Sequence, residues 1–500
     1  MKSLSHNGVF ILPNPQRVGL AIRFNGYSPP MNATEELMAI RWVQKLGTPY
    51  VEDAVFRANF WKDFKAELIK GQHGSTPKSL EDIDFSEVIE HVAQMKKYKE
   101  SLNSSQKKYI ASDAKKARED RKKLYGYATI DGQKVELSNF VVDPPGIFMG
   151  RGKHPLRGRW KPEIHTIDIT LNLSPKSPMP EGNWSGRAWY PNELWIAKWH
   201  DKLTGMVKRV QLSETSDIRQ ERNKYKFDRA MSLFGSIGKV RDHTETGMMS
   251  KDELMRKVAT VAYLIDTFKI RVGDEEATEA GTVGATSLSG KNIIISDKGN
   301  TVRLSFLGKD SIPFDSEKQV SQVAYDNLKW LSAYDKPFDG VSSALVRKFF
   351  SKVAPGLTAK IFRTFSATHE FSEQLKQLKG QPSDVLLEAN VAVAQLLNHK
   401  RAVPKTWEKS WQAKIDQLKK LDHTSDDRAR VRVQKLKRKM DKMLATKELN
   451  LTTSIKQYVD PRVPMRYCTV NDYDWRKYYP KSLQGRFTWA ENEVKVEFDK

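Results

Sequence analysis

The sequence predicts a multidomain α+β protein, and three observations support this class. The chain has 500 residues, more than one ordinary hydrophobic core accommodates, so two to four domains or subdomains are expected. Residues 125–210 are rich in strand patterns and include an Asp-Gly turn signal at Asp131-Gly132. Residues 217–402 are mostly helical in pattern, with one predicted hairpin around a turn signal at residues 297–300.

The charge balance indicates the class of partner. Lys and Arg number 84 against 61 Asp and Glu, which gives a net charge of +23 and a pI near 9.6. Such a surplus favours a polyanion, nucleic acid before an anionic membrane. The longest apolar run, Val258–Phe268, is interrupted by Asp266 and is too short to span a bilayer, and no signal peptide is evident at the N-terminus. We therefore expect no membrane partner.

Cysteine and histidine usage excludes two further classes of site. The only cysteine, Cys468, rules out an intramolecular disulfide framework and fits a reducing compartment. Its expected role is that of a buried bystander. The ten histidines show no pair spaced three or four residues apart, so spacing predicts no metal site.

The N-terminal region is expected to contain short strands followed by helices. Strand-like runs occupy residues 9–13 and 19–24. Asn32 and Glu35 form a capping-box pattern that opens an amphipathic helix, and residues 51–68 show a second helical pattern.

Two basic helical stretches stand out along the chain. Residues 96–123 carry 11 Lys or Arg and four acidic residues, which is typical of a solvated helical face and, alternatively, of a cationic projection facing a polyanion. Residues 405–447 carry 14 Lys or Arg and six acids, with heptad-like apolar spacing in two arms around residues 423–427. The second stretch therefore predicts an antiparallel helical hairpin.

A glycine-rich segment at residues 144–155 invites a phosphate-loop interpretation, which the spacing rejects. Ile147 stands where the first glycine is required, and His154 replaces the Ser or Thr. The glycines that flank Arg151 let the backbone approach a ligand closely while the guanidinium reaches into it. A glycine-rich turn with a surface arginine remains the alternative.

Four cationic residues and one tyrosine form the candidate catalytic set: Arg271, Lys309, Arg363, His399 and Tyr458. Guanidinium groups stabilise the oxygens of a pentacoordinate phosphorus, a lysine protonates a leaving alkoxide, and a tyrosine is a possible nucleophile. Together these groups suit metal-free transesterification at a phosphodiester. Pro461 is expected to end any helix that carries Tyr458. Spacing alone does not separate these residues from surface cations.

Five segments carry a family resemblance: PPGIFMGRGKHP (144–155), FLGKDSI (306–312), GLTAKIFRTFSA (356–367), NHKRAVPKTWEKS (398–410) and YVDPR (458–462). In this order they resemble the motifs of eukaryotic-type (type IB) DNA topoisomerase I, and the likeness runs over essentially the whole chain.

The resemblance implies a bilobed clamp around duplex DNA. The implied parts are a mixed α/β DNA-binding cap lobe at 1–217 with its basic projection at about 96–123, a mainly α catalytic core at 218–402 related to tyrosine recombinases, a coiled-coil-like linker at 403–448, and a small α C-terminal domain at 449–500 that bears the tyrosine.

The resemblance also implies an activity: relaxation of positive and negative supercoils, without ATP, metal or cofactor, by transient single-strand cleavage. Tyr458 is expected to form a 3′-phosphotyrosine, Lys309 to act as general acid, and Arg271, Arg363 and His399 to stabilise the transition state. The DNA contacts implied by matched positions are Arg151, Lys153, His154, Asp310, Lys360, Thr453 and Gln457. A monomer acting on double-stranded supercoiled DNA is expected, with Asp310 as partner of Arg151 and the His154 region and Glu276–Glu279 at the lips of the clamp.

Departures from the family pattern point to an archaeal member. Gln457 and Asp274 stand where nuclear enzymes usually have Asn, which puts camptothecin sensitivity and one DNA contact in doubt. The long charged N-terminal tail of nuclear members is missing, and the linker is short. The expected location is the cytoplasmic nucleoid, or the nucleus if the source is a eukaryote.

Two alternatives remain open. A site-specific tyrosine recombinase shares the Arg, Lys, Arg, His, Tyr chemistry, although the segment at 144–155 and the linker hairpin argue against it. A non-enzymatic basic DNA-binding protein explains the net charge but neither Tyr458 nor the order of the motifs.

Overall fold

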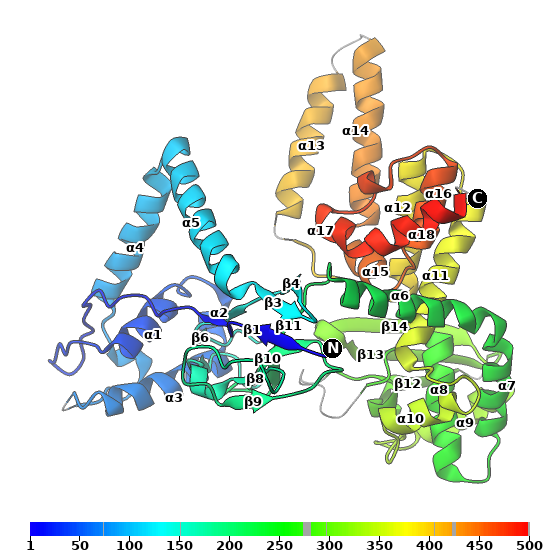
Figure 1. Ribbon diagram of the computed structural model, residues 1–500, viewed down its shortest axis with the longest axis horizontal. Helices are drawn as coiled ribbons and strands as arrows, with labels where there is room; N and C mark the ends of the chain where they lie inside the picture. Colours follow the sequence, from blue (N-terminus) through cyan, green and yellow to red (C-terminus); the bar gives the residue numbers. More distant parts are fainter. Residues whose placement is uncertain are drawn as a thin grey trace. The chain divides into compact units, whose positions relative to one another are not determined.

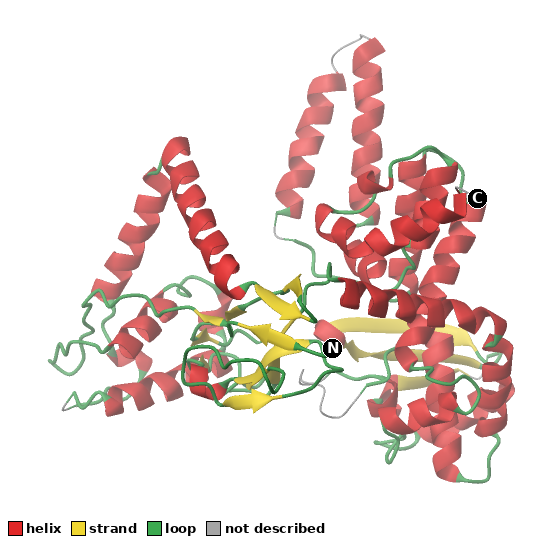
Figure 2. Cartoon of the chain, in the orientation of Figure 1, coloured by secondary structure: helices red, strands yellow, loops and turns green. Residues whose placement is uncertain are grey.

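The chain divides into two units, and each contains both helices and strands (Figure 1, Figure 2). The computed structural model describes residues 1–73, 75–150, 152–273, 282–296, 298–404, 406–422 and 427–498. Unit 1 comprises Met1–Arg219 and unit 2 comprises Gln220–Lys500. The predicted multidomain α+β class is confirmed.

The helices of unit 1 begin where local capping chemistry directs them. They are α1 (Ala33–Val43), α2 (Pro49–Glu52), α3 (Ala54–Lys70), α4 (Ser86–Ser101) and α5 (Ser104–Tyr125). Asn32 accepts from the N–H groups of Thr34 and Glu35, and Glu35 accepts from the Asn32 N–H, so the predicted capping box is present. The second expected helix starts three residues later than predicted, after Asp53 caps it.

The predicted strand at residues 19–24 is wrong. Only isolated bridges involve this segment, at Ala21, Arg23 and Phe24. The physical reason is a competing acceptor, because the buried Glu36 carboxylate accepts the N–H groups of residues 18–20 at 2.6–2.8 Å. These amides therefore do not take part in a strand ladder.

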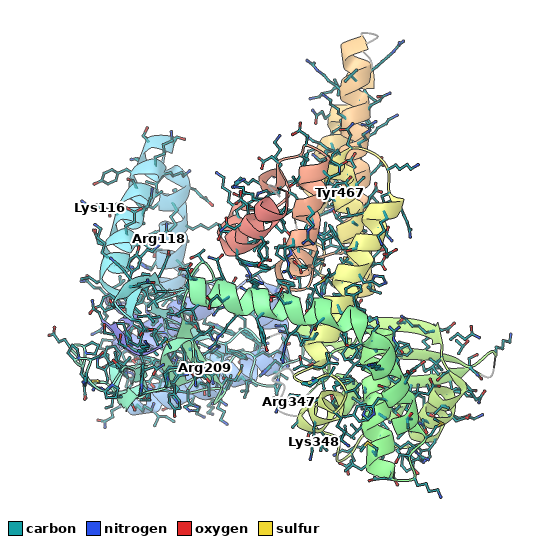
Figure 3. The ribbon with its side chains drawn as sticks, turned by 45° about the vertical axis from the view of Figure 1, so that its right-hand side comes forward. Lys116, Arg118, Arg209, Arg347, Lys348 and Tyr467 are labelled. Carbon is teal, nitrogen blue, oxygen red and sulfur yellow. The ribbon has the colours of Figure 1, made fainter. Side chains whose placement is uncertain are left out.

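The basic stretch at 96–123 is helical and solvated. It covers the end of α4 and most of α5, and α5 has no buried residue. Lys116 and Arg118 extend outward from these helices (Figure 3). This agrees with the solvated-face interpretation of the charge run, since nothing apolar holds α5 against the rest of unit 1 over most of its length.

The strands of unit 1 form small sheets. They are β1 (Leu4–His6), β2 (Phe10–Ile11), β3 (Tyr127–Ile130), β4 (Gln133–Glu136), β5 (Val141–Val142), β6 (Gly146–Ile147), β7 (Trp160–Lys161), β8 (Thr170–Asn172), β9 (Gly186–Ala188), β10 (Trp195–His200) and β11 (Val207–Gln211). The sheet orders are β1-β3-β4, β11-β10-β8-β9, β2-β5 and β6-β7. The predicted Asp-Gly hairpin joins β3 to β4, with Asp131 and Gly132 both at positive φ.

Unit 2 is built mainly from helices, which surround one three-stranded sheet. The helices are α7 (Ile237–Met248), α8 (Glu253–Phe268), α9 (Gln322–Ser332), α10 (Ser343–Ser351), α11 (Ala359–Gln377) and α12 (Pro382–Leu396), and α6 (Asp217–Ser232) runs into unit 2 from the unit boundary. A continuous apolar core joins α8 to α9, α10, α11 and the sheet, and it includes Leu264, Leu328, Phe350 and Phe362. This core fixes the relative positions of the chain segments that lead into the site.

The sheet of unit 2 has one strand more than the sequence predicted. β12 (Ile293–Ser296) and β13 (Thr301–Gly308) form the expected antiparallel hairpin, and β14 (Ile312–Gln319) pairs with β13 along its full length. The sequence of β14, IPFDSEKQ, contains a proline and three charged residues. It pairs as an edge strand, where proline and charge are tolerated.

The C-terminal part of unit 2 contains the predicted helical hairpin and a small helical cluster. α13 (Trp407–Asp422) and α14 (Asp427–Ala445) pack against each other, with Leu436 buried (Figure 1). The cluster is α15 (Leu451–Gln457), α16 (Arg462–Val470), α17 (Lys481–Gln484) and α18 (Thr488–Phe498). Cys468 is buried as expected, and burial, with Asp474 nearby, raises the pKa of its thiol to about 12. Among the described helices, none is long and apolar enough to cross a membrane.

Candidate active site

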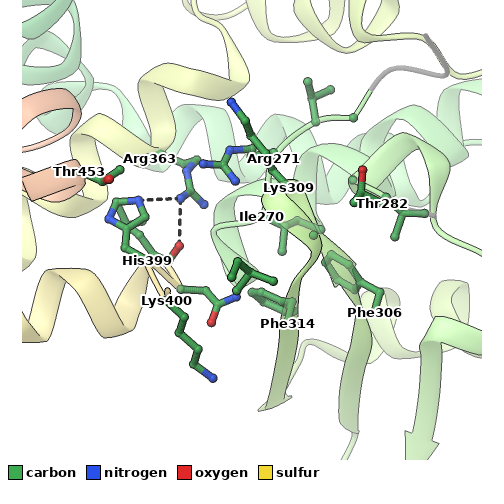
Figure 4. A pocket seen from close by; sticks show the side chains of 18 of the residues that line it. Ile270, Arg271, Thr282, Phe306, Lys309, Phe314, Arg363, His399, Lys400 and Thr453 are labelled. Carbon is green, nitrogen blue, oxygen red and sulfur yellow. Dashed lines mark hydrogen bonds between the residues drawn. The ribbon is translucent and has the colours of Figure 1, made fainter. Parts of the chain in front are cut away.

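Four of the five predicted catalytic residues line one pocket of unit 2, although they come from segments far apart in the sequence (Figure 4). The pocket has a volume of about 380 Å³. Arg271 follows α8, Lys309 follows β13, Arg363 lies in the first turns of α11, and His399 follows α12. The fold therefore gathers the cationic set that sequence spacing alone could not connect.

Arg271 and Lys309 reach the pocket from exposed backbone turns. After α8 ends at Phe268, Lys269 adopts a left-handed conformation with φ of 56°, which redirects the chain toward Arg271. The Arg271 carbonyl accepts the Ala285 N–H at 2.8 Å, which holds the backbone in place. Lys309 lies at the tip between β13 and β14, and both side chains are exposed.

Arg363 is buried, with 4% of its surface exposed, and its guanidinium is held by neighbours. It donates to the Lys269 carbonyl, to the Leu397 carbonyl at 3.0 Å and to His399 Nε2 at 3.3 Å (Figure 4). Burial lowers the pKa of Arg363 to about 10, so the group stays charged at neutral pH. A fixed, desolvated cation of this kind is suited to stabilising an oxyanion.

His399 is also buried and bridges two elements of the site. Its Nδ1 lies 2.8 Å from Ser454 Oγ on α15, and its Nε2 faces Arg363. Burial, together with the charges of Arg363 and Arg271, lowers the pKa of His399 to about 3. The imidazole is therefore neutral at pH 7.

Tyr458 packs against Arg363 and His399. It follows the last residue of α15, which confirms that the helix ends before Pro461, and 6% of its surface is exposed. Its ring lies 5.1 Å from the Arg363 guanidinium and 5.1 Å from the His399 ring. Thr453, one turn earlier, is among the described residues that line the pocket, whereas Tyr458 is not.

The environment of Tyr458 favours its anion. Burial acts to raise the pKa of the phenol, but the positive charges of Arg363 and Arg271 outweigh it, so the pKa falls below its usual value. A phenol with a lowered pKa is a better source of the nucleophilic phenolate at neutral pH. Packing therefore positions the Tyr458 side chain, and the two arginines favour its phenolate.

A charged network that no sequence pattern predicted supports the segment after Tyr458. Arg462 bonds to Asp460, to Asp228 on α6 at 2.7 Å and to Glu493 on α18 at 2.9 Å. Lys226 of α6 donates to the Gln457 carbonyl at 3.0 Å. These contacts fix both ends of the tyrosine segment. The only sequence signal for them is the position of Arg462 within the YVDPR motif.

Further neighbours of the catalytic set also escaped prediction. Ser454 contacts His399, and Thr368 of α11 donates to the Tyr458 carbonyl at 3.3 Å and accepts the Asp460 N–H at 3.1 Å. Lys400 and Asn450 line the pocket. Serine and threonine occur in many helices without such roles, so no sequence pattern singles them out.

The remaining predicted DNA contacts are distributed over both units. In unit 2, Thr453 lines the pocket, Lys360 is exposed in the first turn of α11, and Gln457 is half-buried. In unit 1, Lys153 is exposed, and the His154 ring packs edge-on against Phe148 at 5.0 Å. Their approach to DNA stays a prediction.

Several predicted residues lie outside the described part of the chain. They are Arg151, Asp274 and Glu276–Glu279, and the same holds for the side chain of Asp310. The proposed pairing of Arg151 with Asp310 is therefore neither supported nor contradicted.

Comparisons with known proteins match the whole length of the chain. Residues 215–431 match the family model described as "Eukaryotic DNA topoisomerase I, catalytic core", residues 1–212 match the one described as "Eukaryotic DNA topoisomerase I, DNA binding fragment", and residues 430–500 match the "C-terminal topoisomerase domain".

The relatives that the chain matches are also named as DNA topoisomerases I. The chain is 30% identical to DNA topoisomerase 1 beta of Arabidopsis thaliana and to DNA topoisomerase 1 of Drosophila melanogaster, with 98% of this chain aligned in both. It spans 58% and 54% of the length of these two relatives. It is 28% identical to the mitochondrial DNA topoisomerase I of Rattus norvegicus, over 100% of this chain and 92% of that protein.

Proposed function

Since the chain belongs to the eukaryotic-type DNA topoisomerase I family, we propose that it relaxes positively and negatively supercoiled DNA as a type IB enzyme. The observation that carries the proposal is the pocket of unit 2. There, two arginines, a lysine and a histidine from four separate segments converge beside a tyrosine whose pKa is lowered. These groups supply nucleophile, acid and charge stabilisation, so the chemistry needs neither ATP nor a metal ion.

In the proposed cleavage step, the Tyr458 oxygen attacks a DNA phosphorus. The phenolic proton passes to water, a Tyr–O–P bond forms, and the P–O5′ bond breaks. Lys309 gives a proton to the departing 5′ oxygen, which leaves as a hydroxyl. The product is a 3′-phosphotyrosine, and the reverse reaction reseals the strand. Because the ester keeps the energy of the broken bond, resealing requires no external energy source.

Arg271, Arg363 and His399 are proposed to stabilise the charge that develops on the phosphate oxygens. Arg363 is best prepared for this role, because three acceptors already fix its guanidinium in the pocket. Arg271, which is exposed and lies in the segment after α8, adds a second cation. Preorganised donors of this kind contribute more in a desolvated site than in water.

The finer organisation of the molecule is part of the proposal. Residues 1–217 would form a DNA-binding cap lobe, 218–402 the catalytic core, 403–448 a linker and 449–500 the C-terminal domain, closing as a monomeric clamp around duplex DNA. The charge of +23 and the solvated helix α5 support a polyanionic partner. The proposed location follows the DNA, in an archaeal nucleoid or a eukaryotic nucleus.

The decisive experiment is relaxation of positively and negatively supercoiled plasmid in EDTA without ATP, comparing the natural protein with Tyr458→Phe. The natural protein should relax both signs and form a covalent adduct with DNA on addition of denaturant. Tyr458→Phe should do neither while still binding DNA. Tyr467→Phe, which alters a half-buried tyrosine of α16 (Figure 3), is the matched control and should remain active.

Other outcomes point to the alternatives. DNA binding by the natural protein without any covalent adduct would favour a non-enzymatic binding protein. Sequence-specific strand exchange between two duplexes would favour a recombinase. Binding itself should depend steeply on salt, with a slope of about −0.9 in log K against log salt for each neutralised phosphate, and a slope near zero would contradict the clamp.

A further inference from the structure

The protonation state of His399 poses a problem for its proposed role. A neutral imidazole has one N–H group and one acceptor nitrogen. Arg363 can only donate, so His399 Nε2 must be the acceptor in the contact of 3.3 Å between them. The proton therefore lies on Nδ1, and it is donated to Ser454 Oγ at 2.8 Å.

This tautomer cannot help a phosphate. Ser454 occupies Nδ1 on the side of α15, and Nε2 accepts from Arg363 in the free protein. Arg363 and His399 both line the pocket, so a phosphate bound there would compete with Nε2 for the Arg363 N–H and leave Nε2 as the ring atom that faces the phosphate. A phosphate oxygen only accepts hydrogen bonds. In the free protein, His399 has no proton on Nε2 and so cannot donate one to it. In the free protein the surroundings of His399 lower its pKa to about 3, so the ring is neutral when DNA binds. A neutral ring can donate from Nε2 only as the other tautomer.

Ser454 is able to support both tautomers. A hydroxyl accepts a hydrogen bond from Nδ1–H, and after rotation of its own hydrogen it donates one to bare Nδ1. No part of Ser454 is exposed, so water does not replace it as a partner. Partners on the second nitrogen commonly determine which tautomer a histidine adopts.

We propose that Ser454 is a positioning residue that selects the tautomer of His399. In the free protein its hydroxyl accepts a hydrogen bond from Nδ1–H. With a DNA phosphate in the pocket, Nδ1 gives its proton to solvent, Nε2 takes one from solvent, and the Arg363 N–H turns from Nε2 to the phosphate. The Ser454 hydroxyl then donates to Nδ1, which leaves Nε2–H directed at the phosphate oxygen. The proposal rests on the proposed function, because it concerns the same pocket. It adds a residue on α15, the helix that ends just before Tyr458, and this residue acts through His399.

The backbone of Ser454 has a separate task, which makes the side chain testable on its own. Its carbonyl accepts the N–H groups of Tyr458 at 2.9 Å and Val459 at 3.1 Å. Ser454→Ala leaves these bonds in place and removes only the hydroxyl. Ser454→Thr keeps the hydroxyl. Ser366→Ala is a matched control, because Ser366 is buried on α11 and its hydroxyl has no hydrogen-bond partner among the described residues.

The first test measures single-turnover formation of the covalent adduct. Ser454→Ala should slow it by about 10- to 100-fold, the usual cost of removing a group that orients another functional side chain, with DNA affinity unchanged. Ser454→Thr should recover most of the rate, and Ser366→Ala should match the natural protein. In a His399→Gln background, Ser454→Ala should cause no further loss. An undiminished rate for Ser454→Ala, or equal losses in both backgrounds, would overturn the proposal.

The second test reads the tautomer directly and does not depend on activity. Long-range proton–nitrogen spectra of the full chain, labelled with nitrogen-15 in histidine and assigned by comparison with His399→Gln, report which nitrogen is protonated. The free protein should show Nδ1–H, and Tyr458→Phe bound to a short duplex should show Nε2–H. A proton on the same nitrogen in both states contradicts the switch. If no variant forms an adduct, the proposed function fails, and the spectrum of the free protein still decides the tautomer.

Discussion

The two sides of the candidate site hold their functional groups in different ways. Arg363, His399 and Tyr458 form what we call the buried side: each is at most 6% exposed and contacts at least one of the others. Arg271 and Lys309 form the open side, where both side chains are exposed. The buried side is ordered by the protein before DNA binds, whereas the side chains of the open side can be ordered by the substrate. Substitutions on the two sides should therefore separate catalysis from stability.

Apart from loss of the Tyr458 nucleophile, the largest expected effect is on the open side, at Lys309. Lys309→Ala should slow cleavage by about 10²- to 10⁴-fold, the range for loss of a general acid, without changing the unfolding temperature. A substrate with sulfur in place of the bridging 5′ oxygen should restore most of the rate, because a thiolate leaving group of pKa about 8.5 needs no proton. Single-turnover cleavage of both substrates measures this.

Lys400→Ala is the matched control for Lys309, because it removes another exposed cation that lines the same pocket. Lys400→Ala should change the cleavage rate by the same factor on the normal substrate and on the substrate with bridging sulfur. If Lys309→Ala were equally slow on the sulfur substrate, the lysine would not be the acid.

On the buried side, Arg363→Ala should reduce both activity and stability. Cleavage should fall by about 10²- to 10³-fold, as for loss of an oxyanion donor. The carbonyls of Lys269 and Leu397 would lose their donor, at about 1–3 kcal/mol for each buried group left unpaired. Denaturant unfolding and cleavage are measured on the same preparations. Arg271→Ala, on the open side, should lose activity with unfolding unchanged, and equal destabilisation of both variants would remove the distinction between the sides.

The pH dependence of stability offers a smaller test of the buried side. The pKa of His399 is about 3 in the folded protein and about 6.5 when unfolded, so the unfolded chain binds the extra proton. The free energy of unfolding is not reduced by His399 above pH 6.5. It falls as the pH decreases toward 3, by about 2 kcal/mol at pH 5. Unfolding curves for His399→Gln should therefore depend less on pH between 6.5 and 4.5. His369→Gln, at a half-exposed position, is the control and should retain the natural slope.

The smallest effect on chemistry is expected from deleting the hairpin α13–α14. Within the described residues, an ion pair between Lys442 and Asp384 on α12 joins it to the body of unit 2, and a pair at the surface contributes about 0–1 kcal/mol. Replacing Trp407–Ala445 by a short Gly-Ser linker should keep single-turnover cleavage within about threefold, while the number of supercoils removed per cleavage event changes. Plasmid relaxation followed molecule by molecule measures this number, and complete loss of cleavage would show that the hairpin supports the buried side.

Local chemistry was sufficient to predict those elements of the fold that are set by neighbours in sequence. The Asn32 capping box and the Asp131-Gly132 turn each depend on two to four residues, and both are present. The segment at 19–24 was wrongly predicted as a strand, and strand β14 was not predicted, for the opposite reason. Their hydrogen bonds are decided by distant partners, the Glu36 carboxylate in one case and β13 in the other.

The site shows the same division. The sequence supplied the five residue types that phosphodiester chemistry requires, but only resemblance to a family connected Arg271 with His399 across more than a hundred residues. Ser454 and Thr368 were not predicted, because their importance comes from distant partners: His399, which follows α12, contacts Ser454, and the segment after α15 contacts Thr368. Such contacts are properties of the packed core and leave no local pattern.

The base of the hairpin has a consequence for how this protein can change over evolutionary time. Lys400 pairs with Leu449, the Arg401 N–H donates to the Glu448 carbonyl at 2.8 Å, and the Asn450 N–H donates to the His399 carbonyl at 2.7 Å. The chain thus enters and leaves the hairpin at adjacent points beside the pocket. Doubling the length of a closed loop costs only about 0.6 kcal/mol. Insertions and deletions in the arms can therefore accumulate in descendant lineages without compensating changes at His399 or on α15.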